Sequence, residues 1–469
     1  MSLPASTSWW WDDALRTETD ARPCLPLLGQ KTVDVAVVGG GFTGLWTALA
    51  LKERRPSLSV AVIEASECGS GASGKNGGKV HGYWASLGGM ARLLGDDAAL
   101  EVAQAGTRAQ DAIRAFSTRP GTDVWWRESG NIRVSAAPGQ DAKLAGYVSE
   151  AQRLGVPDTV MALSPAQVQS HCQSPAFRAG LYLPEGANVH PARLARALRA
   201  EALAQGVTIY ENTPMTGLDR DTPNLLHTPL GSLVARDVIL ATNAALGSDP
   251  YIAPHLCILS SFALMTDPAG EALESIWPGS EGIADLRMFL HYFRKTRDGR
   301  VLMGSGSGPI GYGGRTDDHA LRFDAASAAR AESGLRRLLP ALAGIGLAQV
   351  WGGAIDVSSD RLPFFGTFPG TRVHFGCGYS GHGVNATYIG GRCLSAIALD
   401  IRDEWSTLPL CTRTLPTLPP EPFRTVGGRA IRWGIIRCEE ADERKQTAPL
   451  AAQALAALPT LFGMKIGTR

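Results

Sequence analysis

The chain has 469 residues, and 54 of them are glycine, well above the typical share of about 7%. Glycine is in excess without a matching excess of proline, which argues against a collagen-like or disordered chain and suggests many tight turns or close approaches of the backbone to a ligand. The 45 Lys and Arg residues balance 44 Asp and Glu residues, giving a net charge of +1. This balance disfavours nucleic acid as a partner.

The eight cysteines are scattered without a CxxC pair, so zinc ribbons and redox dithiols are not expected. The nine histidines form no metal-binding spacing, and we predict no metal. Residues 1–30 lack the basic and apolar regions of a signal peptide, and no run of 18 apolar residues could span a membrane. The sequence therefore predicts a cytoplasmic protein without a spanning membrane segment.

The first predicted element is a β-branched strand over residues 33–38, followed by the G-x-G-x-x-G turn 39–44 and a helix. A second strand, 59–63, ends on Glu64. In this pattern the glycines allow a tight turn and a close approach to a pyrophosphate, while the acid can bind a ribose hydroxyl. We predict a dinucleotide site here, with a glycine turn in another α/β fold as the alternative.

A second glycine-rich stretch, 69–76, is a near miss to the phosphate loop GxxxxGK[ST]. Asn76 takes the place of the magnesium-binding hydroxyl, and more glycines follow where a helix should begin. Nucleotide hydrolysis is therefore disfavoured. Because the stretch comes directly after Glu64, we expect it to pass close to the rest of the same dinucleotide.

Helices and strands then alternate along the chain. Helices are predicted at 91–118, 191–205, 319–339 and 383–401, and strands at 131–134, 207–210, 224–228, 232–234, 238–241, 349–351 and 373–375. The mixture indicates two interleaved domains. Residues 376–383 form a glycine-rich turn before the last long helix. The exposed amides at the N-terminus of this helix could face a developing negative charge. A purely structural turn is the alternative.

Four blocks together resemble a known family: 33–45, 71–78, 238–244, and 360–363 with 378–383. They resemble the D-amino-acid oxidase, glycine oxidase and sarcosine oxidase superfamily of FAD-dependent amine oxidoreductases. Within it the chain looks nearest to the branch of γ-glutamylputrescine oxidases and aminophosphonate oxidoreductases. The resemblance covers roughly residues 8–405.

The resemblance implies an α/β chain with a Rossmann-like FAD-binding domain interleaved with an antiparallel-sheet substrate domain. The FAD-binding domain would comprise 30–90, 150–247 and 350–405, and the substrate domain 91–149 and 248–349. Residues 406–469 would be a C-terminal extension, expected to pack on the FAD domain or across a homodimer, with an interfacial membrane contact as the alternative. The glycine-rich segment 304–314 is expected to be a mobile loop over the active site.

The implied activity is FAD-dependent oxidation of a small primary or secondary amine, with O2 or another electron acceptor. FAD would be non-covalent, because Gly353 stands where sarcosine oxidases carry a flavin-linking cysteine and the loop after Glu64 has no histidine. The residues expected to bind the cofactor are Gly39, Gly41, Phe42, Thr43, Gly44, Glu64, Ala72, Ser73, Asn76, Gly77, Gly78, Met215, Ala241, Thr242, Gly378, Tyr379, Ser380, Gly381, His382 and Gly383.

Departures from the family pattern bear on the substrate. Ile355 and Gly381 match the arginine positions of amino-acid oxidases, and Asn385 matches a lysine of sarcosine oxidases. The usual carboxylate anchor is thus missing, which disfavours a simple α-amino acid. Leu302 falls where relatives carry a lysine that speeds the oxygen reaction, which raises the prospect of a dehydrogenase.

No obligatory catalytic base is implied. The candidate residues of the substrate pocket are Tyr292, Arg294, Trp351, Lys75 and Asn385. Two alternatives stay open at this point. One is an NAD-dependent dehydrogenase that uses the same first fingerprint, and the other is a non-catalytic flavin-binding electron-transfer subunit.

Overall fold

The first of two large sheets is built around parallel strands. The computed structural model describes residues 7–18 and 22–461. The strand order is β10–β11–β12–β1–β2–β9, with β19 beside β12 and β18 beside β19. β19, β12, β1, β2 and β9 run parallel to one another, whereas β10, β11 and β18 each pair antiparallel with their neighbours. The strands are β1 (Gly29–Val38), β2 (Val60–Ile63), β9 (Thr208–Tyr210), β10 (Gly217–Asp219), β11 (Asn224–His227), β12 (Gly231–Leu240), β18 (Phe364–Thr367) and β19 (Val373–Cys377).

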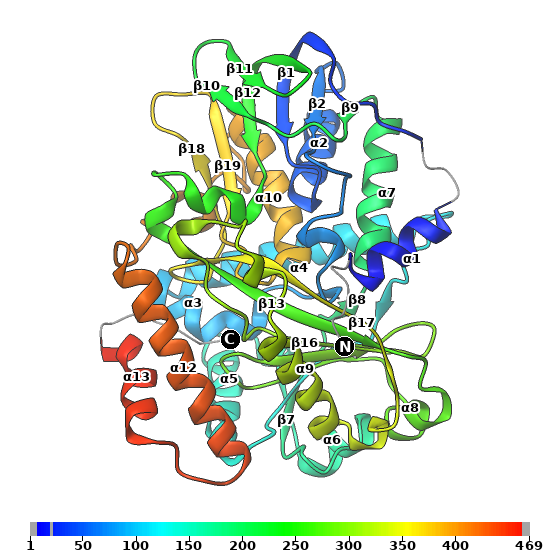
Figure 1. The fold of residues 1–469 in the computed structure, drawn as a ribbon, viewed down its shortest axis with the longest axis vertical. Coiled ribbons are helices and arrows are strands. Elements are labelled where there is room, and N and C mark those ends of the chain that lie inside the picture. The colour runs from blue at the N-terminus through cyan, green and yellow to red at the C-terminus, as the bar shows by residue number, and fades with distance from the viewer. Residues whose placement is uncertain (1–6, 19–21, 462–469) are drawn as a thin grey trace.

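Helices bury the central strands of this sheet. The last four residues of β1 and all of β2 are buried, as expected for parallel strands covered on both faces. The covering helices include α2 (Phe42–Arg54), α7 (Pro191–Ala204) and α10 (Gly383–Ala398). α2 and α10 pack closely at Gly391, where an added Cβ would lie 2.7 Å from the Cβ of Trp46. Figure 1 shows this layer in the upper half of the molecule.

The second large sheet lies in the lower half of Figure 1 and is antiparallel except where β14 pairs with β5. Its order is β17–β13–β16–β15–β14–β5–β7–β6. The predicted α/β fold with an interleaved antiparallel second sheet is confirmed. The strands are β5 (Asn131–Val134), β6 (Met161–Leu163), β7 (Gly180–Leu183), β13 (Leu256–Thr266), β14 (Gly282–Asp285), β15 (His291–Lys295), β16 (Val301–Ser305) and β17 (Leu347–Ser358).

The domain limits remain a prediction, but sheet membership bears on them. β6 and β7 pair with each other and, through β5, belong to the second sheet. This favours placing residues 161–183 with the substrate side, although the sequence-based division put 150–247 in the FAD-binding domain. A third, small sheet is formed by β3 (Lys79–Val80), β8 (Ala187–Asn188) and β4 (Arg127–Glu128).

Several predicted elements differ from the observed ones. The single helix expected over 91–118 is two, α3 (Leu87–Leu94) and α4 (Asp96–Ser117), because Gly95 between them has φ +87°. The helix expected from 319 begins only at α9 (Ala325–Leu338), where the side chain of Asp324 caps it. The strands expected at 232–234 and 238–241 are one strand, β12. The remaining longer helices are α1 (Trp9–Thr17), α5 (Asp141–Arg153), α6 (Pro165–His171) and α8 (Gly270–Ile276).

The C-terminal extension packs on both sides of the molecule. Residues 408–413 pack on the FAD-binding side, where Arg413 pairs with Asp360, and the later helices lie along the second sheet. The extension contains α11 (Pro409–Thr412), α12 (Phe423–Glu443) and α13 (Leu450–Leu461), of which α12 and α13 run beside the lower sheet in Figure 1. Arg432 and Arg429 of α12 donate to the carbonyls of Ser307 and Ile310. The segment 304–314, expected to be a mobile loop, thus accepts hydrogen bonds from α12. Residues 462–469 of the extension lie outside the described residues.

Among the described helices, none is long and apolar enough to cross a membrane.

Candidate functional site

A cavity of about 1810 Å³ opens where the two large sheets face each other. The carboxyl ends of β1, β2 and β12 contribute Val38, Ile63 and Leu240. The second sheet contributes residues of β5, β13, β14, β15 and β17. Parallel sheets bind ligands at the carboxyl ends of their strands. Since pockets for one small molecule measure about 300–1,000 Å³, this volume has room for a dinucleotide and a second ligand.

The structure brings most of the predicted cofactor-binding residues together on this cavity. Those that line it are Gly39, Gly41, Phe42, Thr43, Glu64, Ala72, Ser73, Asn76, Gly77, Gly78, Met215, Ala241, Thr242, Tyr379, Gly381, His382 and Gly383. Gly44, Gly378 and Ser380 do not line it. They lie beneath its surface, where they set the backbone: Gly378 and Ser380 have φ +82° and +53°, and Gly44 packs against the carbonyl of Gly39.

Glu64 is fixed at the end of β2 by two backbone amides. Its carboxylate accepts hydrogen bonds from the amides of Gly40, at 2.7 Å, and Ser66, at 3.0 Å. Burial raises the pKa of Glu64, and these hydrogen bonds oppose that effect. The carboxylate therefore lies beside the first glycine turn, where the fingerprint requires a ribose-binding acid.

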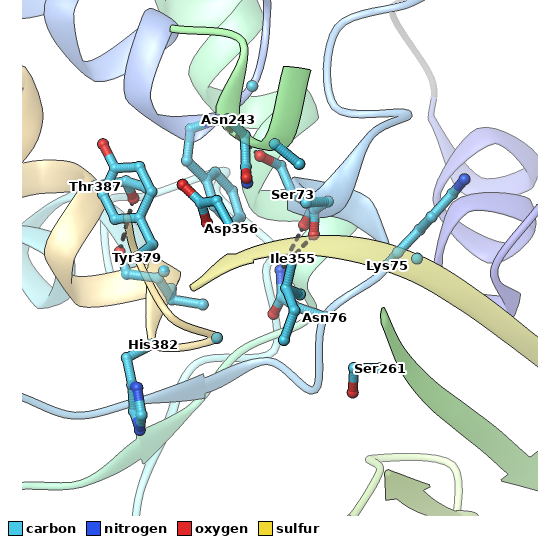
Figure 2. A pocket seen from close by; sticks show the side chains of 18 of the residues that line it. Ser73, Lys75, Asn76, Asn243, Ser261, Ile355, Asp356, Tyr379, His382 and Thr387 are labelled. Atoms are coloured by element: carbon cyan, nitrogen blue, oxygen red, sulfur yellow. Dashed lines mark hydrogen bonds between the residues drawn. The ribbon is translucent and has the colours of Figure 1, made fainter. Parts of the chain in front are cut away.

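The two glycine-rich stretches contact each other. The amide of Phe42, in the first turn of α2, donates to Ser73 Oγ at 2.8 Å. Asn76 joins the second stretch internally, since its Nδ2 donates to the carbonyl of Ser73 and its Oδ1 accepts from the amide of Gly78. Asn76 thus organises a loop, which is a different task from the metal-binding hydroxyl of a phosphate loop. Figure 2 shows Ser73, Lys75 and Asn76 on this loop.

The C-terminal glycine motif docks on the same helix. Tyr379 accepts a hydrogen bond of 2.7 Å from the Thr43 hydroxyl in α2, and both side chains are buried. Residues 336 positions apart in the sequence therefore form one wall of the cavity, with His382 beyond Tyr379 (Figure 2).

These residues fit FAD. The N-cap residue of α2, Gly41, has no side chain to cap the helix, and the first turn holds no acidic residue, which suits a pyrophosphate. Glu64 would supply the acceptor for a ribose, and the glycines of both loops add no side chain where they line the cavity. Gly39, Gly41, Glu64, Ser73 and the 379–383 segment would hold the group.

The sequence reading missed Asp356 on β17. It lines the cavity, is 1% exposed, and accepts a 2.5 Å hydrogen bond from the amide of Gly378. Figure 2 shows it next to Ile355. Burial raises the pKa of Asp356 to about 7. A lone acid in a strand gives no sequence signal, because only the fold buries it beneath the glycine motif.

This pKa predicts how stability depends on pH. A carboxyl with a raised pKa stabilises the fold below its unfolded pKa and loses that contribution as the pH rises through about 7. Asp356→Asn keeps the site neutral, so its unfolding free energy should match that of the wild type near pH 4 and exceed it at pH 8, by up to about 4 kcal/mol. Denaturant unfolding across this range measures the difference. Parallel curves for the two proteins would contradict the assignment.

Three of the five candidate substrate residues line the cavity: Tyr292, Lys75 and Asn385. Tyr292 OH lies 3.3 Å from Ser261 Oγ. Asn385 donates to the carbonyl of Gly106 at 2.9 Å, while its Oδ1 has no partner in the part of the chain that the structure describes. Burial, and then the charge of Arg322, lower the pKa of Lys75.

Arg294 and Trp351 do not line the cavity but support the loop behind it. Arg294 is 2% exposed, lies 4.8 Å over the ring of Trp10 and donates to the carbonyl of Gly78 at 3.3 Å. Burial lowers its pKa to about 9. Trp351 donates from Nε1 to the carbonyl of Lys75 at 2.8 Å. Both residues therefore hold residues 75–78 in place from the side of this loop that faces away from the cavity.

Comparisons with known proteins agree with this site. The family model "FAD dependent oxidoreductase" (DAO) matches residues 34–397. γ-Glutamylputrescine oxidoreductase of Escherichia coli K12 is 30% identical over 86% of this chain and 89% of the relative. Sarcosine oxidase subunit beta of Arthrobacter is 24% identical over 76% and 85%. The crystal structure of glycine oxidase from Geobacillus kaustophilus superposes with a TM-score of 0.67 at 22% identity, over 82% of this chain and 99% of that one.

The family match spans most of the chain and covers both glycine-rich stretches and the 378–383 motif. It confirms the predicted fold class and the predicted cofactor, FAD. We expect that cofactor to bind in the cavity, next to the Glu64 carboxylate and the N-terminus of α2. The chain belongs to the DAO family of FAD-dependent oxidoreductases.

Proposed function

We propose that the protein oxidises a primary or secondary amine that is not a simple α-amino acid. The observation that carries the proposal is the pair Ile355 and Gly381, which both line the cavity. An added Cβ at Gly381 would lie 4.0 Å from Cδ1 of Ile355. The two positions where amino-acid oxidases of the resembled family carry arginines thus meet in the cavity, and they are apolar. The amine class is supported by the relatives, whose names specify γ-glutamylputrescine, sarcosine and glycine.

The chemistry follows from the cofactor and the lining residues. A bound FAD would supply the acceptor for a hydride from the carbon next to the nitrogen, and water would convert the imine to a carbonyl compound and an amine or ammonia. The chain has to bind and orient the neutral amine and to exclude water. The unpartnered Oδ1 of Asn385 is suited to accept a hydrogen bond from the amine nitrogen, with Tyr292 forming part of the opposite wall.

Anaerobic flavin reduction tests the proposal. Diamines and amines with a distant acidic group are expected to bleach the flavin at least about 100-fold faster than glycine or sarcosine, because nothing at 355 and 381 pairs with an α-carboxylate. Ile355→Arg should narrow this gap, and Ile355→Met should leave it unchanged. Fastest bleaching by glycine or sarcosine would contradict the proposal. Bleaching by no amine would favour the electron-transfer alternative.

We also propose that FAD is non-covalent and that the physiological acceptor is not O2. Gly353 lines the cavity without a side chain that could bond to the flavin. Leu302 is fully buried, with Cδ2 3.4 Å from the Cβ position of Gly77, so the segment beside the second loop presents an apolar group rather than a lysine. Acid precipitation should release the flavin, and reduced protein should reoxidise slowly in air.

A cytoplasmic location is proposed on the cysteines, since all eight are free thiols. A thiol count on unfolded protein prepared without reductant should return eight, and a lower count would contradict the proposal. The homodimer also stays a proposal, testable by the mass of the protein in solution.

A further inference from the structure

Two cations line the cavity from strands outside the parallel sheet. Lys79 of β3 lines the cavity, and so does Arg133 of β5. Within the described ranges, no carboxylate oxygen lies within 4.0 Å of either charged group. Burial, and then the charges of Arg133 and Arg294, lower the pKa of Lys79 to about 7. The charged forms of these side chains thus repel one another with no described acid to compensate.

Lys79 reaches from the small sheet toward the second large sheet. An added Cβ at Gly282 of β14 would lie 2.6 Å from Lys79 Cε and 2.6 Å from Asn131 Oδ1. Gly282 pairs with Asn131 in the sheet, and Lys79 pairs with Asn188. The absence of a side chain at Gly282 therefore leaves the space in which the stem of Lys79 runs next to Asn131.

Asn131 supplies an independent sign of a missing ligand. It is 5% exposed and lines the cavity, yet neither its Nδ2 nor its Oδ1 has a hydrogen-bond partner in the described chain. Buried amides almost always have partners, since leaving them unpaired is costly. Arg133, two positions further along β5, projects from the same face of the strand. It donates to Tyr147 OH at 3.2 Å and stacks 5.5 Å over that ring.

The acids on this side of the cavity are already engaged. Glu185 accepts from the amide of Gly82, from Trp84 Nε1 and from the Thr107 hydroxyl. Asp285 accepts from the amide and the Nδ1 of His291. The charges that act on Lys79 are those of Arg133 and Arg294, so the local field is positive. An anion beside Lys79 would favour its charged form and pair with Arg133.

We propose that Lys79, Asn131 and Arg133 bind an anionic group at the end of the substrate remote from its amine. The inference rests on the proposed amine oxidation and names the substrate class within it: an aminoalkyl carboxylate or phosphonate. This site is distinct from the 355 and 381 positions that the resemblance assigns to an α-carboxylate. It explains how an enzyme without the usual carboxylate anchor can select an amine by the negative charge at the opposite end of the substrate.

The test compares substrates that differ only at that end. The probes are ω-amino carboxylates, aminoalkyl phosphonates and uncharged alkylamines of matched length, and the readout is kcat/KM of anaerobic flavin reduction. The wild type should prefer the better-fitting anionic series to the alkylamines by about 10- to 100-fold, the range of a charged hydrogen bond. Whether the carboxylate or the phosphonate series is faster identifies the source of the anion.

Three variants assign the preference to Lys79. Lys79→Met should remove most of the preference while leaving the alkylamines within about twofold, Lys79→Arg should retain it, and the exposed Lys31→Met should behave as wild type. Alkyl carboxylates and phosphonates without an amine should bind the wild-type holoenzyme and not Lys79→Met in calorimetry. Equal rates for charged and uncharged amines, or a preference that survives Lys79→Met, would overturn the inference while the proposed function stands. Failure of every amine to bleach the flavin, with anion binding intact, would overturn the proposed function alone.

Discussion

Gly44→Ala is expected to abolish FAD binding and to lower the free energy of unfolding by about 3 kcal/mol or more. The added Cβ would lie 1.9 Å from the carbonyl oxygen of Gly39 and 3.2 Å from Cγ1 of Val37. Both atoms belong to the rigid strand and turn that precede α2, so the helix has to move away from the sheet. Its N-terminal amides would then lose their position on the cavity. The measurements are the ratio of flavin to protein after purification and the denaturant midpoint.

Two further glycines make the effect interpretable. Gly427→Ala is the matched control, because Gly427 also lies in a helix but has open space around its Cβ position; it should bind FAD normally and gain up to about 1 kcal/mol. Gly41→Ala should give an intermediate loss, since its Cβ would meet only Ser73 Oγ, at 2.9 Å. If Gly44→Ala kept full flavin content and stability, the proposed packing of turn on helix would be wrong.

Arg199→Met is expected to lower the free energy of unfolding by about 3–5 kcal/mol. Arg199 is 2% exposed and donates to both carboxylate oxygens of Glu211, which is itself 5% exposed. Without the guanidinium, Glu211 is left as a buried charge with only a 3.5 Å contact to Arg196 and the amide of Cys68. Since that amide begins the loop after Glu64, flavin affinity should fall as well. Denaturant unfolding and flavin titration measure the two losses.

The double variant Arg199→Met/Glu211→Gln isolates the charge. The neutral amide still accepts from Cys68, so at least half of the lost stability should return. Arg178→Met, which breaks an exposed pair with Asp141, serves as control and should leave the free energy of unfolding close to that of the wild type. A double variant as unstable as the single one would show that the loss comes from packing rather than from the uncompensated charge.

The same pair predicts a pH dependence. Burial raises the pKa of Glu211, but the hydrogen bonds and charge of Arg199 outweigh it, so the pKa is lowered overall. A lowered pKa stabilises the fold above the unfolded pKa and is lost as the pH falls. In Arg199→Met, burial raises the pKa of Glu211 without compensation by Arg199. Protonation of Glu211 at lower pH then removes the buried charge and the stability that it costs. The difference in unfolding free energy between wild type and Arg199→Met should therefore become smaller from pH 8 toward pH 5.

Local sequence patterns were sufficient to predict the elements of the FAD-binding half of the molecule. The strand 33–38, the glycine turn and the helix behind it follow one another in sequence, so their signals reinforce each other. The partners of short strands carry no such signal: β6 and β7 have the composition of many strands, and only pairing with β5 places them in the second sheet. The break at Gly95 was also missed, because the apolar spacing on its two sides is continuous.

The site shows the same division. Residues in contiguous motifs, such as Gly77 and Tyr379, line the cavity as predicted. Arg294 was expected at the substrate, yet its fully buried position over Trp10 depends on a helix that precedes it by more than 270 residues. Lys79 and Asn131 went unnoticed because each is unremarkable alone. Their role follows from the shared space above Gly282, which exists only in the folded chain.

The decisive measurement is the visible absorbance of the purified protein before and after anaerobic addition of an ω-amino carboxylate. We expect the spectrum of an oxidised flavin that bleaches on addition and returns with an artificial electron acceptor. A colourless protein, or a flavin spectrum that this amine and its phosphonate counterpart leave unchanged, would contradict this expectation.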